Sequence, residues 1–248
     1  MAQDNILAIV RTVAGRVGLN KPNTVTGSTD VGVVQLWDLA NEEGQELAAR
    51  YDWQVLVREK TFATIAAEDQ GKLVGDPSHT ILSAADGFRK ILNDTIFDRS
   101  QRVQVTGPMS PRVYAAYKGT TAMNGFYSQY RLRGGRLLLY PAPSAGRQYA
   151  FEYISENWVT SSAGDAFRNK FTQDEDIPLL DSNIITMGLL WRWKAAKGLE
   201  YAEDYNKYEA RVLDAMTEDK TTRAVSLDGS NKDGADPFIL VQRGNWSL

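Results

Sequence analysis

The 248-residue sequence has no cysteine and only one histidine. The absence of cysteine excludes disulfides, thiolate nucleophiles and cysteine-ligated zinc, and it fits assembly in a reducing cytosol. The single histidine, His79, lies in the loop-like segment 76–80, where we expect a solvated side chain. Catalytic triads and metal sites that depend on imidazole therefore have one candidate at most, and we expect no metal ion and no cofactor.

The sequence also lacks a charge excess and a long apolar run. Lys and Arg total 28 against 31 Asp and Glu, which leaves a net charge of −3 and no global attraction to nucleic acid or to an anionic membrane. No apolar run approaches the roughly 20 residues of a membrane-spanning helix, and the first five residues lack the basic start of a signal peptide. We therefore expect a soluble, intracellular protein with no membrane partner.

Amphipathic helices are predicted at both ends of the chain. Near the N-terminus, apolar residues recur at spacings of three and four over residues 6–17 and again over 33–51, each time after N-cap candidates. Near the C-terminus, one helix is predicted over residues 178–197, and a tyrosine-rich stripe over 201–216 predicts a second.

The middle of the chain is predicted to be mostly β-structure. An alternating pattern starts at Trp53, and the clearest signal is a hairpin over residues 130–140, where Gly134 and Gly135 supply the positive φ of a tight turn. Further strands are predicted over residues 95–98, 102–105 and 149–154, with short helices at 81–92 and 111–116.

These elements predict an α+β fold in three parts. Residues 1–52 and 165–223 form an antiparallel helical bundle, residues 53–164 form a central β-rich insertion domain, and residues 224–248 form an extended C-terminal tail. The tail joins a Gly- and Asp-rich stretch to a group of apolar residues, a pattern that indicates a segment in need of a partner. These residues are Pro237, Phe238, Ile239, Leu240, Val241 and Trp246.

Two indoles on the predicted helix 178–197 limit how that helix can pack. Trp191 and Trp193 point about 200° apart because a helix has 3.6 residues per turn. One intrachain face cannot cover both side chains. Either this helix is central and covered on all sides, or one indole meets a neighbouring subunit, and both alternatives remain open.

Three arginines surround the turn of the predicted hairpin. Arg131 and Arg133 share one face of the first strand, and Arg136 begins the second. They could contact phosphate or an acidic partner protein. A charged edge that discourages strand-to-strand aggregation explains them about as well.

Clusters of carboxylates are the only other candidates for chemistry. A glycoside hydrolase needs two carboxyl groups at a set separation, and the sequence offers the clusters 42–43, 174–176 and 218–219. Adjacent carboxylates usually coat a solvated face, and the second cluster precedes Pro178, where acidic residues would meet a helix N-terminus. We therefore expect these residues to be structural and the protein not to be an enzyme.

The order of elements and four stretches of sequence resemble the head-to-tail adaptor proteins of short-tailed bacteriophages. This family is also described as tail accessory factors, connectors or head-completion proteins. The likeness extends from about residue 5 to residue 220. The stretches that carry it are 36–42 with Trp53, 130–143, 151–158 and 171–194.

The resemblance implies a structural virion protein of the phage neck, assembled in the host cytoplasm. Copies of the chain would form a dodecameric ring between the portal protein and the downstream tail (nozzle) protein, with a lumen through which double-stranded DNA passes without sequence-specific binding. The stretch 236–248 would clamp the portal or a neighbouring subunit, and Trp191 and Trp193 would lie at the subunit interface. Because a strongly basic lumen would retain DNA, we expect its lining to be neutral or acidic.

Two other functions compete with the adaptor hypothesis. The first is a muralytic phage tail protein, a cell-wall glycoside hydrolase that would use Glu42, Glu43 or Asp174. The second is a general tail protein such as a nozzle subunit, which would be larger and more uniformly β than this chain. The predicted helices at both ends argue against the second.

Overall fold

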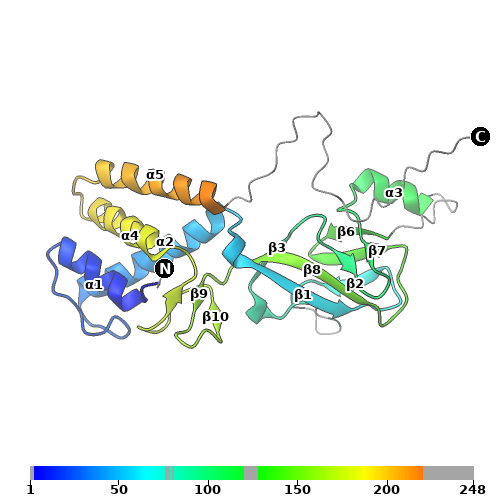
Figure 1. Cartoon of the computed structure of the whole chain (residues 1–248), viewed down its shortest axis with the longest axis horizontal. Coiled ribbons are helices and arrows are strands. Elements are labelled where there is room, and N and C mark those ends of the chain that lie inside the picture. The colour runs from blue at the N-terminus through cyan, green and yellow to red at the C-terminus, as the bar shows by residue number, and fades with distance from the viewer. Residues whose placement is uncertain (1–2, 76–78, 80, 120–127, 220–248) are drawn as a thin grey trace, which may run out of the picture.

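The computed structural model describes residues 3–75, 79, 81–119 and 128–219. These residues form a helical lobe and a β lobe that lie side by side along the long axis of the molecule (Figure 1). Helices occur together with antiparallel sheets, so the predicted α+β class is confirmed. Within this described part, none of the helices combines the length and the apolar character needed to cross a bilayer.

The helical lobe is built from both ends of the chain. Its helices are α1 (Ile6–Arg16), α2 (Val31–Arg50), α4 (Ser182–Ala196) and α5 (Ala202–Asp219). Three of them begin where a short polar side chain accepts a hydrogen bond from a backbone N–H of the first turn. These N-cap residues are Asn5, Asp30 and Asp181.

The start of α4 differs from the prediction. A helix from residue 178 was expected, but Ile177–Pro178 form the short strand β11, which pairs with β9 (Val159–Thr160). The helix begins only at Ser182, because Asp181 supplies the N-cap by accepting a hydrogen bond from the N–H of Asn183.

Helix α4 lies at the centre of the helical lobe. It packs against α1, α2 and α5, and its residues Ile184, Ile185 and Leu189 are buried in the core of this lobe. Close packing depends on glycine at two positions. A Cβ atom at Gly44 would lie 2.0 Å from Cη2 of the buried Trp158, and one at Gly188 would lie 2.2 Å from Cδ of Glu43.

The β lobe consists of two antiparallel sheets. In the first, β8 (Gln148–Ser155) is central: β1 (Val57–Ala63) pairs along one edge, and β3 (Phe88–Ile91) and β4 (Phe97–Asp98) share the other, with β5 (Val103–Gln104) beyond β4. The second has the order β2 (Asp69–Lys72), β7 (Arg136–Tyr140), β6 (Gln129–Arg133). Helix α3 (Pro111–Gly119) adjoins this sheet (Figure 1). The core of the lobe includes Phe62, Leu82, Ile96, Tyr130, Leu137, Tyr149 and Phe151.

The predicted hairpin is confirmed. Strands β6 and β7 pair in register from Gln129↔Tyr140 to Arg133↔Arg136. Gly134 and Gly135 have φ values of 58° and 72°, as a two-residue turn with two positive φ angles requires.

Two local predictions in the β lobe are wrong. The helix expected over residues 81–92 is a single 3-10 turn, Ala84–Asp86, followed by strand β3. The turn has its own capping box between Ser83 and Asp86, and Gly87 at φ 60° ends it at once. The strand expected from Trp53 begins only at Val57, because Gln54–Leu56 form another 3-10 turn.

The chain returns to the helical lobe earlier than expected. The sequence predicts the boundary after residue 164, but Trp158 and Val159 already pack in the core of the helical lobe. From there β9 pairs with β10 (Phe167–Arg168) and β11 in a small sheet next to the helices (Figure 1).

Candidate functional site

Both indoles of α4 are covered largely by the chain itself. Trp193 is only 4% exposed and belongs to the core of the helical lobe. Trp191 is half-buried, and its ring centroid lies 5.2 Å from that of Tyr205 and 6.3 Å from that of Tyr201. The central position of α4 therefore accounts for both side chains without a second copy, which favours the first of the two alternatives. A role of either indole at a subunit interface stays a prediction.

Part of this cluster nevertheless reaches the surface. Tyr201 and Tyr205 are 42% and 39% exposed, and together with Trp191 they form what we call the aromatic ridge. Leu199, in the turn before α5, is also exposed. Within the described part of the chain the indole Nε1 of Trp191 is buried and has no hydrogen-bond acceptor, although such groups normally find one.

Arg192 joins α4 to α2 through three carboxylates. Its Nε donates to Oε2 of Glu43 at 2.6 Å, and its other nitrogens donate to Oε1 of Glu42 at 2.9 Å and to Glu46. Glu43 is fully buried. Burial raises the pKa of Glu43, and the hydrogen bond from Arg192 opposes that shift. Glu43 is therefore used for helix packing, with no solvent access for a substrate.

The acidic residues Asp174 and Asp176 stabilise turns of the chain by accepting hydrogen bonds. Both carboxylate oxygens of Asp174 accept hydrogen bonds from the segment 24–26, and those of the buried Asp176 accept from Arg168, Thr172 and Gln173. Desolvation would raise the pKa of Asp174, but the hydrogen bonds from Thr24 and from residues 25–26 outweigh it and hold the pKa below its usual value. The expectation that this cluster meets the N-terminus of the next helix is wrong, because Asp181 occupies that position.

The hairpin arginines lie against α3. The guanidinium groups of Arg131 and Arg133 lie 4.7 Å and 5.9 Å from the ring centroid of Tyr114. Arg136 donates from Nε to Oδ2 of Asp69 at 2.6 Å. Arg131 and Arg133 thus help to attach α3 to the hairpin, and Arg136 joins β7 to β2. Contact of the three arginines with phosphate or a partner protein stays a prediction.

His79 is a loop residue, but it is not fully solvated as predicted. Its side chain is half-buried, and Nδ1 lies 2.7 Å from the carbonyl oxygen of Gln70. Over residues 3–75, 79, 81–119 and 128–219, no group of three or more acidic or imidazole side chains is placed to hold a metal ion.

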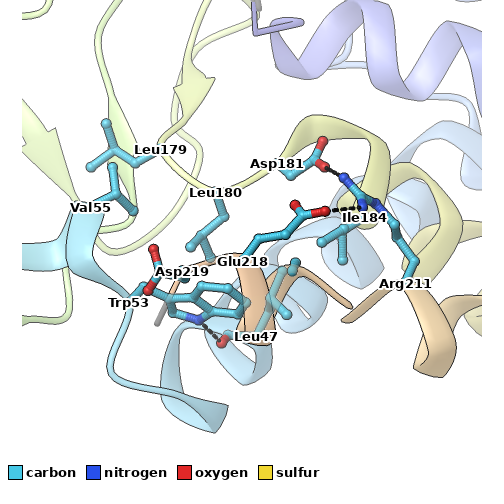
Figure 2. A pocket seen from close by; sticks show the side chains of 11 residues that line it. Leu47, Trp53, Val55, Leu179, Leu180, Asp181, Ile184, Arg211, Glu218 and Asp219 are labelled. Carbon is cyan, nitrogen blue, oxygen red and sulfur yellow. Dashed lines mark hydrogen bonds and ion pairs between the residues drawn. The ribbon is translucent and has the colours of Figure 1, made fainter. Parts of the chain in front are cut away.

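A cavity of about 310 Å³ opens where α5 ends, next to the C-terminal end of α2 and the segment before α4 (Figure 2). We call it the α5 groove. Its apolar lining is Leu47, Trp53, Val55, Leu179, Leu180, Ile184 and Ala215, and its polar lining is Asp181, Arg211, Glu218 and Asp219.

The polar groups of the α5 groove are bonded to one another or to the backbone. Arg211 lies 3.1 Å from Oδ2 of Asp181 and 3.7 Å from Oε1 of Glu218. Trp53 donates from Nε1 to the carbonyl oxygen of Leu47 at 2.8 Å, and Asp219 accepts from the N–H of Gln54 at 2.9 Å. The groove therefore presents mainly apolar side chains between satisfied polar groups (Figure 2).

Sequence reasoning missed the α5 groove. Its lining comes from three stretches, 47–55, 179–184 and 211–219, which are brought together only by the packing of α2, α4 and α5. The one signal in the sequence is Trp53, but its alternating neighbours predict a strand at this position.

The apolar tail residues Pro237, Phe238, Ile239, Leu240, Val241 and Trp246 lie outside the described residues. No protein-family model matches this chain, and a search of curated proteins finds no match to its sequence.

Proposed function

We propose that this chain is a structural virion protein, the head-to-tail adaptor of a short-tailed bacteriophage. It forms a dodecameric ring between the portal and the tail nozzle, and DNA passes through the lumen. Its helices act as the bundle that carries the inserted β lobe, and the C-terminal tail extends to a partner. The observation that carries the proposal is the half-exposed aromatic ridge on the helical lobe.

The aromatic ridge has the composition of an interface anchor. Tyr and Trp are enriched at the centres of protein interfaces, where their large rings bury much area at little cost in side-chain entropy. Tyr201 and Tyr205 are held in place by Trp191, and exposed Leu199 extends the apolar surface beside them. A neighbouring copy that covers this ridge would bury preorganised rings, which favours binding.

The bonds of the carboxylates support a structural role over wall hydrolysis. A glycoside hydrolase needs two carboxyl groups that face the same sugar. Here Glu43 is enclosed with Arg192, and both oxygens of Asp174 are engaged by the segment 24–26.

In the proposed ring the same contact between neighbouring copies recurs around the axis, and this repetition strengthens the joint between portal and tail. One ridge buries a modest area, but a closed ring repeats the contact at every interface, and the tail adds a second point of attachment. We expect the copies to bind the portal on one side and the nozzle on the other, with a neutral or acidic lumen that does not retain DNA.

Co-sedimentation with the portal protein from the phage genome that encodes this chain tests the proposal. We expect the full chain to join the portal in a ring stoichiometry, and we expect Tyr201→Ser combined with Tyr205→Ser to lower the affinity at least tenfold, since aromatic anchors each contribute about 1–2 kcal/mol or more. Asn206→Ser, an exposed change on the same helix, is the matched control.

Two results would overturn the proposal. One is a full chain that never associates with the portal. The other is release of soluble sugar from cell walls by the purified chain, with loss of that activity in Glu42→Gln, Glu43→Gln or Asp174→Asn, which would assign the protein to the hydrolases.

A further inference from the structure

We infer that the α5 groove is a docking site for the apolar segment 237–241 of the same chain in the free protein. The adaptor proposal concerns the contacts of the tail after assembly, whereas this inference concerns where the tail is held before assembly. It depends on the lining of the groove, on the position at which α5 ends and on the charges at its rim.

The lining of the α5 groove suits an apolar segment. The groove encloses a space of about 310 Å³, which is at the lower end of the size range of ligand pockets. Its floor is formed by side chains that are at most 5% exposed, Leu47, Trp53, Leu180 and Ile184, and its accessible apolar walls are Val55, Leu179 and Ala215. The indole Nε1 of Trp53 is already used by the carbonyl oxygen of Leu47, so its ring offers only an apolar surface. A polar ligand would find few free partners here, whereas an apolar one would release water from the lining.

The length of the chain beyond α5 favours the same copy as the source. Helix α5 ends at Asp219, which itself lines the groove, and the 17 residues 220–236 separate it from Pro237. A random coil of 17 residues has a root-mean-square span of about 21–25 Å, so a linker of this length is long enough to bring residues 237–241 back to the groove. A tether of this kind gives an effective concentration in the millimolar range, which exceeds that of separate copies in dilute solution.

The charges of the two surfaces are complementary. The rim carries three acidic side chains, Asp181, Glu218 and Asp219, against the single cation Arg211. From Pro237 to residue 248 the one charged side chain is Arg243, two residues after Val241. Arg211 already pairs with Asp181 and Glu218, but three acidic groups against one arginine leave the rim negative. With 237–241 in the groove, an orientation that brings Arg243 to this rim is therefore favoured.

Docking in the same chain has a consequence for assembly. A free apolar segment would promote association between copies at the wrong place and time. A docked segment is hidden until a partner surface offers better contacts, and the tail then leaves the groove. Occupancy of the groove and attachment of the tail to a partner are therefore mutually exclusive.

The absence of cysteine allows a direct test in the free full-length chain. A pair of substitutions, Ala215→Cys in the groove and Ile239→Cys in the tail, creates the only two thiols of the protein. In a glutathione redox buffer we expect an intramolecular disulfide, which forms when one cysteine displaces glutathione from the mixed disulfide of the other. Intact-mass measurement then shows the loss of two hydrogens and no glutathione adduct, and non-reducing electrophoresis shows a monomer. The matched control is Leu213→Cys with Ile239→Cys, because Leu213 lies on α5, is 56% exposed and does not line the groove. The groove pair should close at least about tenfold faster.

Three outcomes would overturn the inference. Equal rates for the two pairs would mean that the tail does not dock, a covalent dimer would identify a second copy as the occupant, and two free thiols would mean that the groove is empty. If Ala215→Cys disturbs folding, as judged by circular dichroism, Val55→Cys with Leu240→Cys replaces it, since Val55 lines the groove and is partly exposed. No portal is needed, so this result is independent of the adaptor proposal.

Discussion

The helical lobe and the β lobe hold together in different ways. In the helical lobe, segments almost 150 residues apart meet through buried polar groups, as in the contact between Glu43 and Arg192. In the β lobe, one insert between residues 57 and 155 is held by strand pairing and by aromatic rings such as Tyr130, Tyr149 and Phe151. The helical lobe therefore forms only when both ends of the chain are in place, and its stability depends on a few positions.

The largest expected effect is at the buried ion pair. We expect Arg192→Met to lower the free energy of unfolding by about 3–5 kcal/mol, because the buried Glu43 loses its partner and must either stay charged without it or take up a proton. Urea unfolding followed by circular dichroism measures the change. The matched control is Arg50→Met, which removes the more exposed pair between α2 and Glu209 of α5 and should cost about 1 kcal/mol or less. Equal costs would contradict the dependence of this lobe on its buried pair.

A smaller effect is expected at the contact between α2 and Trp158. Gly44→Ala places a Cβ atom within the indole ring, and the overpacking should cost about 2–3 kcal/mol, again measured by urea unfolding. Gly15→Ala on α1 meets only the flexible end of Lys21 at 3.1 Å, so the higher helix propensity of alanine should leave stability unchanged or slightly raised. If Gly44→Ala behaved like Gly15→Ala, α2 and Trp158 could not be packed as described.

The β lobe should respond more mildly to a change in its hairpin. Gly134→Ala forces a residue with a Cβ atom into a positive φ and should cost about 1–2 kcal/mol, whereas Gly134→Asn should cost less because asparagine adopts this conformation more readily. Thermal unfolding of the two variants distinguishes them. If Gly134→Ala lowered the free energy of unfolding as much as Arg192→Met does, the two lobes would not differ in how strongly single positions control their stability.

The smallest expected effect is the pH dependence of the stability that Asp174 contributes to the helical lobe. The pKa of Asp174 is lower in the folded protein than in the unfolded chain, so its contribution is complete above about pH 5 and is lost as the pH falls toward the folded value. Asp174→Asn should therefore lower stability by about 1 kcal/mol at pH 7 and by progressively less toward pH 3. Unfolding curves at pH 3, 5 and 7 check this, and a constant difference across that range would contradict it.

The sequence predicts elements well where the signal is local. The N-caps before α1 and α2, the stripe of α5 and the Gly134-Gly135 turn all act within a few residues, and the structure has them where they were expected. The predictions that fail concern segments whose structure depends on contacts with residues far away in the sequence. Ile177–Pro178 pair with β9 and so delay α4, and Phe88–Ile91 pair with β8 where a helix was expected over 81–92.

The candidate sites were harder to predict from the sequence than the helices and strands. The angular separation of Trp191 and Trp193 correctly left open a helix covered on all sides, but periodicity cannot say which neighbours cover it. The α5 groove and the capture of Arg192 by α2 depend on how three helices meet, so no single stretch of sequence carries their signal.

The proposed ring is built through the aromatic ridge of the helical lobe, so assembly should leave the central sheet of the β lobe as it is in the free chain. Hydrogen–deuterium exchange of the full chain, free and bound to the portal, tests it most directly. We predict slower exchange over residues 199–210 in the assembly, with residues 57–63 and 148–155 of the central sheet unchanged. New protection confined to the β lobe, or none in either lobe, would contradict the account.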